Sequence, residues 1–127
     1  KTQLPAKVAE PPPSVLDAAR KLPFTPNHED VYALFLKTPQ GPVLASHHFS
    51  AGGKGSATVP MGEILRQALQ HKAKAIALVH NHPSGNPNPS EEDKAVTRQL
   101  AHEATRHGLA LAAHVIVTSE GATSIAA

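Results

Sequence analysis

The stretch AKAIALVHNHPSGNPNPSEEDKAVTRQLAHEATRHG, residues 73–108, combines three segments of different character. Its apolar start, residues 73–80, has the length and continuity of a strand that is buried on both faces of a sheet. A loop rich in Pro, Gly and Asn follows over residues 81–89. Residues 90–108 predict a helix, because Ser90 suits the N-cap, the first turn is acidic, the last turn is basic and a glycine follows. A buried strand that leads through a loop into a helix indicates an α/β domain.

Other segments predict the remaining strands of the same sheet. Residues 30–38 and 43–50 are rich in β-forming side chains and are separated by the turn sequence PQGP, so they predict an antiparallel hairpin. Residues 109–121 predict a second buried strand, and residues 122–127 predict a strand at the edge of the sheet. The expected sheet is therefore mixed and mostly antiparallel, with helices on its faces.

Two further helices are expected beside this sheet. Residues 14–23 predict a short helix with Ser14 as its N-cap. Residues 60–72 predict a helix with Pro60 in its first turn. The apolar face of this second helix is expected to consist of Ile64, Leu65, Ala68 and Leu69.

The length of 127 residues suits one compact domain. Residues 1–13 end in PPP and lack periodicity, so they predict a tail or linker, and residues 14–127 are expected to form the domain. No apolar run approaches the length of a transmembrane helix, and the first residues do not resemble a signal peptide. A cytoplasmic location without a membrane partner is therefore expected.

The charged and sulfur-containing residues restrict what the chain can bind. The 12 Lys and Arg residues against 10 Asp and Glu give a net charge of +2, which permits nucleic-acid binding without favouring it. There is no Cys, so disulfides and Cys-based zinc sites are excluded. Any metal must be held by His and carboxylate side chains, and the nine histidines are the candidates.

The loop after the apolar run carries such candidates. His80 and His82 are two residues apart, and in an extended chain both side chains point to the same side. Asp93 lies in the first turn of the following helix and can return its carboxylate to the same point. Two imidazoles and one carboxylate leave a fourth tetrahedral position for water, which is typical of catalytic rather than structural zinc sites.

The same residues also have a purely structural interpretation. The spacing from Ser90 to Asp93 is that of a capping box, in which the two side chains satisfy the first backbone N–H groups of a helix. Asn and Pro residues are common in loops, and a histidine at the end of a strand often only marks a polar edge. Spacing alone leaves both interpretations open.

A longer pattern resembles a known family. His80-x-His82, seven residues, Ser90, two residues and Asp93 fit the H-x-H-x7-S-x2-D signature of the JAMM (MPN-plus) zinc hydrolases. HNHPSG followed by PSEED is similar to the RadC branch of that family, bacterial proteins long labelled as DNA repair factors. GEILRQALQHKAKAIALVHNHPSG and HVIVTSEG resemble its helix-then-strand approach to the site and its closing strand. The resemblance runs from about Phe24 to the C-terminus and implies a JAMM/MPN-type, cytidine-deaminase-like fold.

The resemblance implies a role for each matching residue. The zinc ligands would be His80, His82 and Asp93. Ser90 would help to stabilise the oxyanion of the tetrahedral intermediate. The general acid/base of the family is a glutamate just before the first strand of the domain, a position that Glu29 fits, although the adjacent Asp30 leaves the register open.

The resemblance also implies a reaction and a substrate class. In the family, Zn²⁺ lowers the pKa of water, the glutamate takes the proton, and hydroxide attacks an amide carbonyl of a peptide or protein. This chain would then be a metallopeptidase or isopeptidase. It departs from the RadC pattern at Ala113, where an Asp usually precedes the closing strand, and the helix-hairpin-helix region that usually precedes the domain is not found in these residues.

The positions of four other histidines predict different surroundings for their side chains. His114 begins the closing strand and could approach the site from the side to orient a ligand. His47 and His48 lie on the second strand of the hairpin and face opposite sides if that strand is regular. His107 lies in the last turn of the long helix, where it is expected only to interact with the helix dipole.

Two other classes of function compete with the zinc hydrolase. The RadC resemblance suggests a DNA-binding or nuclease protein, but the sequence offers no basic stripe and few aromatic residues for stacking on bases. The adjacent letters HNH do not match HNH nucleases, in which these residues are spread over a ββ-metal-α unit. A non-catalytic MPN interaction domain is expected to lack the complete ligand set that this chain has.

Overall fold

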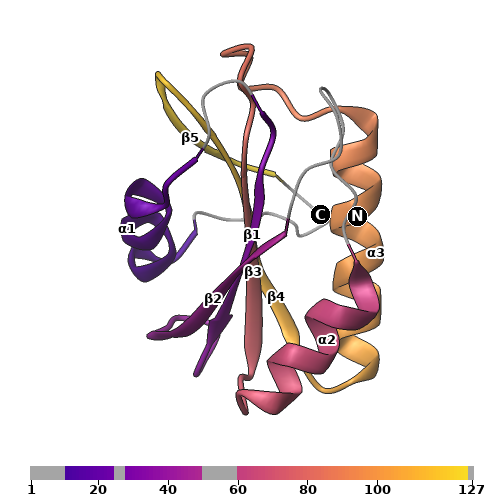
Figure 1. The fold of residues 1–127 in the computed structure, drawn as a ribbon. Helices are drawn as coiled ribbons and strands as arrows, with labels where there is room; N and C mark the ends of the chain where they lie inside the picture. The colour runs from indigo at the N-terminus through magenta and orange to yellow at the C-terminus, as the bar shows by residue number, and fades with distance from the viewer. Residues whose placement is uncertain (1–10, 25–27, 50–59, 126–127) are drawn as a thin grey trace, which may run out of the picture.

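A computed structural model of the chain describes residues 11–24, 28–49 and 60–125. The predicted tail, residues 1–13, therefore lies mostly outside the described residues. The elements in chain order are α1 Pro13–Lys21, β1 Val31–Leu36, β2 Val43–Phe49, α2 Met61–Gln70, β3 Ala75–Asn81, α3 Glu91–Arg106, β4 Ala110–Thr118 and β5 Gly121–Ser124 (Figure 1). Within the described segments, no helix is long and apolar enough to cross a membrane.

The strands form one sheet with the order β2-β1-β3-β4-β5. The pairs β1–β2, β1–β3 and β4–β5 are antiparallel, whereas β3 and β4 are parallel because α3 carries the chain back between them. This arrangement confirms the predicted hairpin, the central position of β3 and the mixed, mostly antiparallel sheet. It also places the C-terminal end of β3 and the beginning of α3 at the same end of the sheet.

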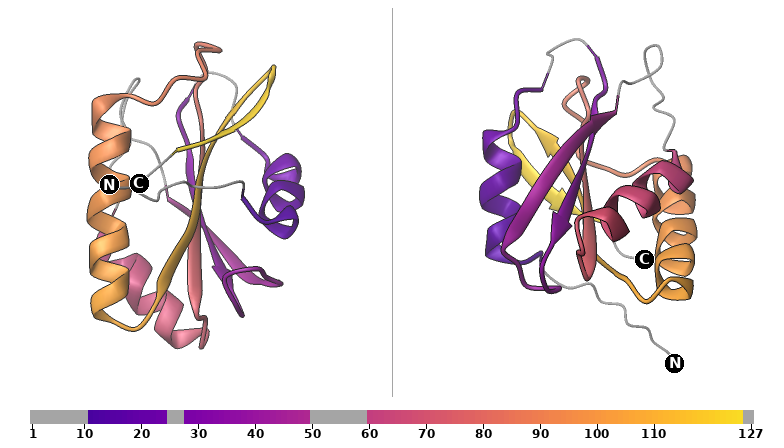
Figure 2. Two further views of the ribbon diagram at one scale, coloured as in Figure 1. Left: turned by 180° about the vertical axis from the view of Figure 1, so that it is seen from behind. Right: turned by 60° about the horizontal axis from the view of Figure 1, so that its bottom comes forward.

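Helices cover both faces of the sheet. α1 lies against one face, and α2 and α3 lie against the other (Figures 1 and 2). The side chains of β1 and β3 alternate between two apolar clusters: Ala33, Phe35, Ile76 and Leu78 pack on the α2 and α3 side. Leu34, Leu36, Ala77 and Val79 pack on the α1 side. Every residue of β1 and β3 is buried, because both faces of these two strands are covered.

Two details of the predicted helices are wrong. α1 begins at Pro13, whose fixed φ suits the first helical position, so Ser14 lies inside the helix and its hydroxyl donates to the Gln40 carbonyl at 3.0 Å instead of capping. In α2, Ile64 and Ala68 are fully buried, but Leu69 is 50% exposed. At about 100° per residue, Ile64 and Leu69 lie at opposite margins of the predicted face, and α2 buries the Ile64 margin while the Leu69 margin stays exposed.

Candidate metal centre

The site lies where the end of β3 meets the first turn of α3. His80 is on β3 and pairs with Val31 in the β1 register, which brings the segment just before β1 to the same place. The chain leaves β3 through a loop and enters α3 at Ser90, which is the N-cap. Side chains from the segment before β1, from the end of β3 and from the first turn of α3 can therefore meet at one place. The last two of these segments are joined by a short loop.

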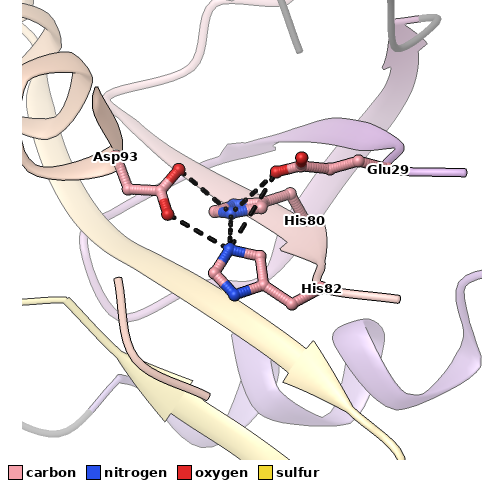
Figure 3. Close-up of side chains that lie close together, drawn as sticks. All are labelled: Glu29, His80, His82 and Asp93. Atoms are coloured by element: carbon pink, nitrogen blue, oxygen red, sulfur yellow. Dashed lines mark hydrogen bonds and ion pairs between the residues drawn. The ribbon is translucent and has the colours of Figure 1, made fainter. Parts of the chain in front are cut away.

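Four side chains meet there with one potential ligand atom each: Glu29, His80, His82 and Asp93 (Figure 3). These atoms all lie within 4.8 Å of one another. The two histidine Nε2 atoms are 3.1 Å apart. The Asp93 carboxylate lies 3.3 Å from the Nε2 of His80 through Oδ1 and 3.1 Å from the Nε2 of His82 through Oδ2. The structure thus brings the three predicted ligands and the predicted acid/base into one cluster.

The alternation of side chains along β1 decides between the two adjacent carboxylates. Glu29 points to the α3 side of the sheet, where its Oε2 lies 3.4 Å from the Nε2 of His80 and 4.0 Å from that of His82. Asp30 is directed away from the cluster, and its Oδ1 lies 3.1 Å from the Nε2 of His48. The register that the sequence left open therefore places Glu29, and not Asp30, beside the histidines.

Burial and hydrogen bonding shift the pKa values of the two carboxyls of the cluster in opposite directions. Burial raises the pKa of the Glu29 carboxyl, and the nearby His80 and His82 only partly oppose this. Burial acts in the same direction on Asp93, but its short contact with the His80 ring and the hydrogen bond from the Ser90 backbone outweigh it and lower the pKa of that carboxyl. Asp93 is therefore held as an anion that can bind a cation, whereas Glu29 is better suited to accept and release a proton.

The loop and the helix cap orient the ligands. The Ser90 side chain accepts a hydrogen bond from the Asp93 backbone N–H at 3.0 Å, and the Ser90 N–H donates to Asp93 Oδ2 at 2.9 Å. The capping box is therefore formed, and its Asp93 is also a member of the cluster, so the two interpretations of this motif do not exclude each other. In the loop, His82 Nδ1 lies 2.8 Å from the Asn86 carbonyl oxygen. A carbonyl only accepts, so in the neutral ring this nitrogen carries the hydrogen and the Nε2 lone pair of His82 faces the cluster.

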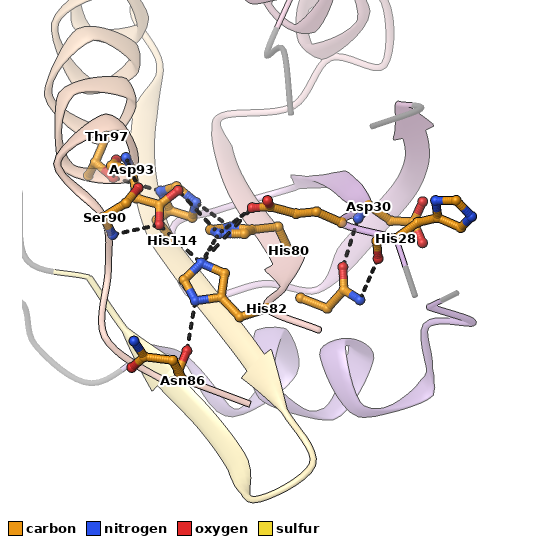
Figure 4. A network of polar contacts seen from close by, with 11 residues as sticks. His28, Asp30, His80, His82, Asn86, Ser90, Asp93, Thr97 and His114 are labelled. Atoms are coloured by element: carbon orange, nitrogen blue, oxygen red, sulfur yellow. Dashed lines mark hydrogen bonds and ion pairs between the residues drawn. The ribbon is translucent and has the colours of Figure 1, made fainter. Parts of the chain in front are cut away.

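His114 does approach the site from the side, as its position in the sequence suggested (Figure 4). Its Nε2 lies 2.9 Å from the Nδ1 of His80. Its Nδ1 lies 2.6 Å from the hydroxyl of Thr97, a residue that the sequence analysis did not single out. Burial, followed by the charge of His80, lowers the pKa of His114 to about 3, so its ring is neutral at ordinary pH.

Asn81, the residue between the two histidines, has a structural role that the sequence did not predict. Its side chain accepts from the Asp30 backbone N–H at 2.7 Å and donates to the His28 carbonyl at 2.9 Å. Asn81 thus holds the backbone on both sides of Glu29. The only signal in the sequence was a polar side chain that ends an apolar strand, which does not reveal a partner more than fifty residues away.

Replacing Asn81 by Ala should loosen this segment selectively. The exchange rate of the Asp30 amide hydrogen is expected to rise roughly 2- to 12-fold, which corresponds to the ~0.5–1.5 kcal/mol of one hydrogen bond. Amide hydrogen exchange measured by NMR checks this, with the amide of Leu34 inside β1 as the internal control. An unchanged rate for Asp30, or an equal rise along all of β1, would contradict a local role for Asn81.

His47, His48 and His107 have contacts outside the cluster. His48 contacts Asp30, and the ring of His47 lies against that of Phe49 with centroids 4.6 Å apart. The Nδ1 of His107 lies 2.9 Å from the Glu103 carbonyl oxygen at the end of α3, which agrees with the expected interaction at a helix C-terminus.

Comparison with known proteins identifies the family. The profile of the RadC-like JAB domain matches residues 10–127. The chain belongs to this family. Membership in the RadC-like JAB domain family agrees with the resemblance seen in the sequence and with the α/β fold. Its match begins three residues before α1 and includes all four members of the cluster.

Relatives of this RadC-like JAB domain are found in several bacteria. A UPF0758 protein of Bordetella avium is 42% identical over 98 residues, which cover 77% of this chain and 43% of the relative. A UPF0758 protein of Coprothermobacter proteolyticus is 35% identical over 124 residues, which cover 95% of this chain and 52% of the relative. The RadC-like JAB domain thus spans about half the length, or less, of the curated relatives that it matches.

Proposed function

We propose that the domain is a zinc-dependent hydrolase that cleaves amide bonds in peptide or protein substrates. The observation that carries this proposal is the convergence of two imidazoles and one carboxylate, with a second, buried carboxylate beside them. Three ligands leave one coordination position for water, and a nearby base is what hydrolysis then requires. Membership in the RadC-like JAB domain family supports the same reaction.

The donor atoms have the spacing that a tetrahedral zinc ion needs. Donors at 2.0–2.1 Å from a tetrahedral metal are separated by about 3.3 Å. The two histidine Nε2 atoms are 3.1 Å apart, and each lies close to one oxygen of Asp93, His80 to Oδ1 at 3.3 Å and His82 to Oδ2 at 3.1 Å. His80, His82 and Asp93 would hold the ion, which supplies a Lewis acid that lowers the pKa of a bound water. Because the described ligands are nitrogen and oxygen atoms without sulfur, they also suit zinc better than a soft metal.

The remaining residues would perform the proton transfers. Glu29, with its raised pKa, would take a proton from the attacking water and later give it to the leaving amine. The capping bond uses only the oxygen of the Ser90 hydroxyl, because the Asp93 N–H donates to it. The hydroxyl hydrogen of Ser90 can therefore be directed at the carbonyl oxygen of the substrate as negative charge develops there.

Removal and return of the metal test the proposal. Protein purified without a polyhistidine tag is expected to contain one zinc ion per chain and to hydrolyse members of a panel of peptide and isopeptide substrates. Treatment with 1,10-phenanthroline should abolish hydrolysis, and added ZnCl₂ should restore it. Elemental analysis measures the zinc content, and detection of products by mass spectrometry measures hydrolysis.

Each alternative function gives a different result in this experiment. Hydrolysis that continues after complete removal of the metal would contradict the zinc mechanism. Absence of any bound metal would indicate a non-catalytic interaction domain. Zinc-independent affinity for DNA that falls steeply with salt, without hydrolysis of any amide substrate, would instead favour a nucleic-acid-binding protein.

A further inference from the structure

A chain of buried polar groups runs from the backbone of α3 through β4 to the end of β3. It joins the Asp93 carbonyl, the Thr97 hydroxyl, the His114 ring and the His80 ring (Figure 4). The side chains in the middle of the chain are almost inaccessible to solvent, since Thr97 is 1% exposed and His114 is 3% exposed. Neither residue has a part in the hydrolysis proposed above.

The first hydrogen in this chain has a fixed direction. The Thr97 Oγ1 lies 2.8 Å from the Asp93 carbonyl oxygen, which can only accept. A hydroxyl has a single hydrogen, so Thr97 donates it to Asp93. Its oxygen is then an acceptor for the Nδ1 of His114, 2.6 Å away. His114 therefore carries a hydrogen on Nδ1.

The direction of the first hydrogen determines the state of His80. Two ring nitrogens 2.9 Å apart form a hydrogen bond only if one carries the hydrogen and the other a lone pair. The single hydrogen of a neutral His114 ring is already on Nδ1, where it faces Thr97, so the Nε2 of His114 presents the lone pair. The Nδ1 of His80 lies 2.9 Å from that lone pair and must donate to it. In a neutral His80 ring, the Nε2 that faces the cluster then has no hydrogen and offers its lone pair.

We propose that Thr97 and His114 are positioning residues that fix His80 in the tautomer whose Nε2 lone pair faces the cluster. The benefit for metal binding rests on the zinc site proposed above. His82 is fixed in the same tautomer by the Asn86 carbonyl, so two lone pairs are directed at each other across 3.1 Å. Two opposed lone pairs repel each other without a cation between them. The site is thus prepared for a metal ion before it arrives.

The chain also fixes the spacing of two ligands. It begins at the Asp93 carbonyl and ends at His80, whose other ring nitrogen lies 3.3 Å from the carboxylate of the same Asp93. This closed ring of contacts ties the first turn of α3 to the end of β3. Without the Thr97 hydroxyl, the tautomer of His80 would no longer be fixed, and Asp93 would lose one of the contacts that hold its position.

The first test is the tautomer of His114 in metal-free protein. The ¹⁵N shifts of its ring nitrogens distinguish a protonated from an unprotonated nitrogen, and the signals are assigned by their disappearance in His114→Gln. We expect hydrogen on Nδ1 and a lone pair on Nε2. The opposite tautomer, or a doubly protonated ring at neutral pH, would overturn the proposal without any variant at Thr97.

The second test compares two substitutions of Thr97. Val has nearly the same shape as Thr but lacks the hydroxyl, so in Thr97→Val His114 is expected to move its hydrogen to Nε2, and zinc affinity should fall about 10- to 100-fold. Thr97→Ser keeps the hydroxyl and should retain the wild-type tautomer and affinity. Competition with a chromophoric chelator measures the affinity. A Val variant with wild-type affinity and tautomer, or equal losses in both variants, would overturn the proposal.

These readouts separate the two proposals. The tautomer is measured without zinc or substrate, and zinc affinity is measured without substrate. If the tautomer is as expected but no amide bond is hydrolysed, the proposed function fails and the positioning role stands. If hydrolysis is zinc-dependent but His114 carries its hydrogen on Nε2, only the positioning role fails.

Discussion

Glu29→Gln is expected to lower kcat/KM for amide hydrolysis by about 10²–10⁴-fold while zinc remains bound at wild-type stoichiometry. Glutamine has almost the same shape as glutamate but cannot take a proton from water. The Glu29 carboxylate is not among the three proposed ligands, and its Oε2 lies 3.4 and 4.0 Å from the two histidine Nε2 atoms. Steady-state kinetics and elemental analysis on the same preparation measure the two effects.

Asp30→Asn is the matched control for this substitution. It removes the same charge from the adjacent residue, whose carboxylate faces away from the cluster toward His48. This variant should keep most of the activity. If Glu29→Gln retained full activity, or if Asp30→Asn caused an equal loss, the role assigned to Glu29 would be wrong.

The second large effect is expected for Asp93→Ala, which should weaken zinc binding by more than about 100-fold. The loss should exceed the 10- to 100-fold that is typical for residues that only orient a ligand, because a ligand itself is removed. The hydrogen bond from the Ser90 N–H favours the ionised form of this carboxyl, which is the form that holds a cation. Elemental analysis of untagged protein measures the bound zinc.

The substitution of Asp93 also breaks the capping box, so the cap must be controlled separately. Ser90→Ala removes the same cap at a cost of about 0.5–2 kcal/mol of stability but leaves the three ligands in place. It should therefore lose thermal stability and keep zinc. Retention of zinc by Asp93→Ala, or an equal loss of zinc in Ser90→Ala, would contradict the assignment of Asp93 as a ligand.

The elements of the fold could be predicted because local patterns are strong where the site is built. The apolar run that ends at His80 and the capped helix that begins after Ser90 required only neighbouring residues for their interpretation. Details that depend on distant contacts could not be predicted in this way. Ser14 bonds to Gln40 rather than capping α1, and the position of Leu69 depends on how α2 rests on the sheet.

The candidate site shows the same division between local and distant information. The motif joined His80, His82 and Asp93 because the three lie in one short segment. Glu29 could not be separated from Asp30, because β1 is apolar on both faces and therefore gives no alternation from which to read the direction of a side chain. The contact of Thr97 with His114 depends on the parallel return of the chain through α3 to β4, which no local pattern specifies.

The separation of the site residues along the chain has a consequence for assembly. The proposed ligands span residues 80–93, a separation of 13 positions, whereas Glu29 lies 51 positions before His80. By the usual logarithmic dependence, closing the longer loop costs about 1.2 kcal/mol more chain entropy than closing the shorter one. The three proposed ligands thus come from one strand-loop-helix unit, whereas the proposed proton acceptor joins them only when β1 pairs with β3. Substitutions in the segment before β1 should therefore leave a domain that still binds zinc but no longer hydrolyses its substrate.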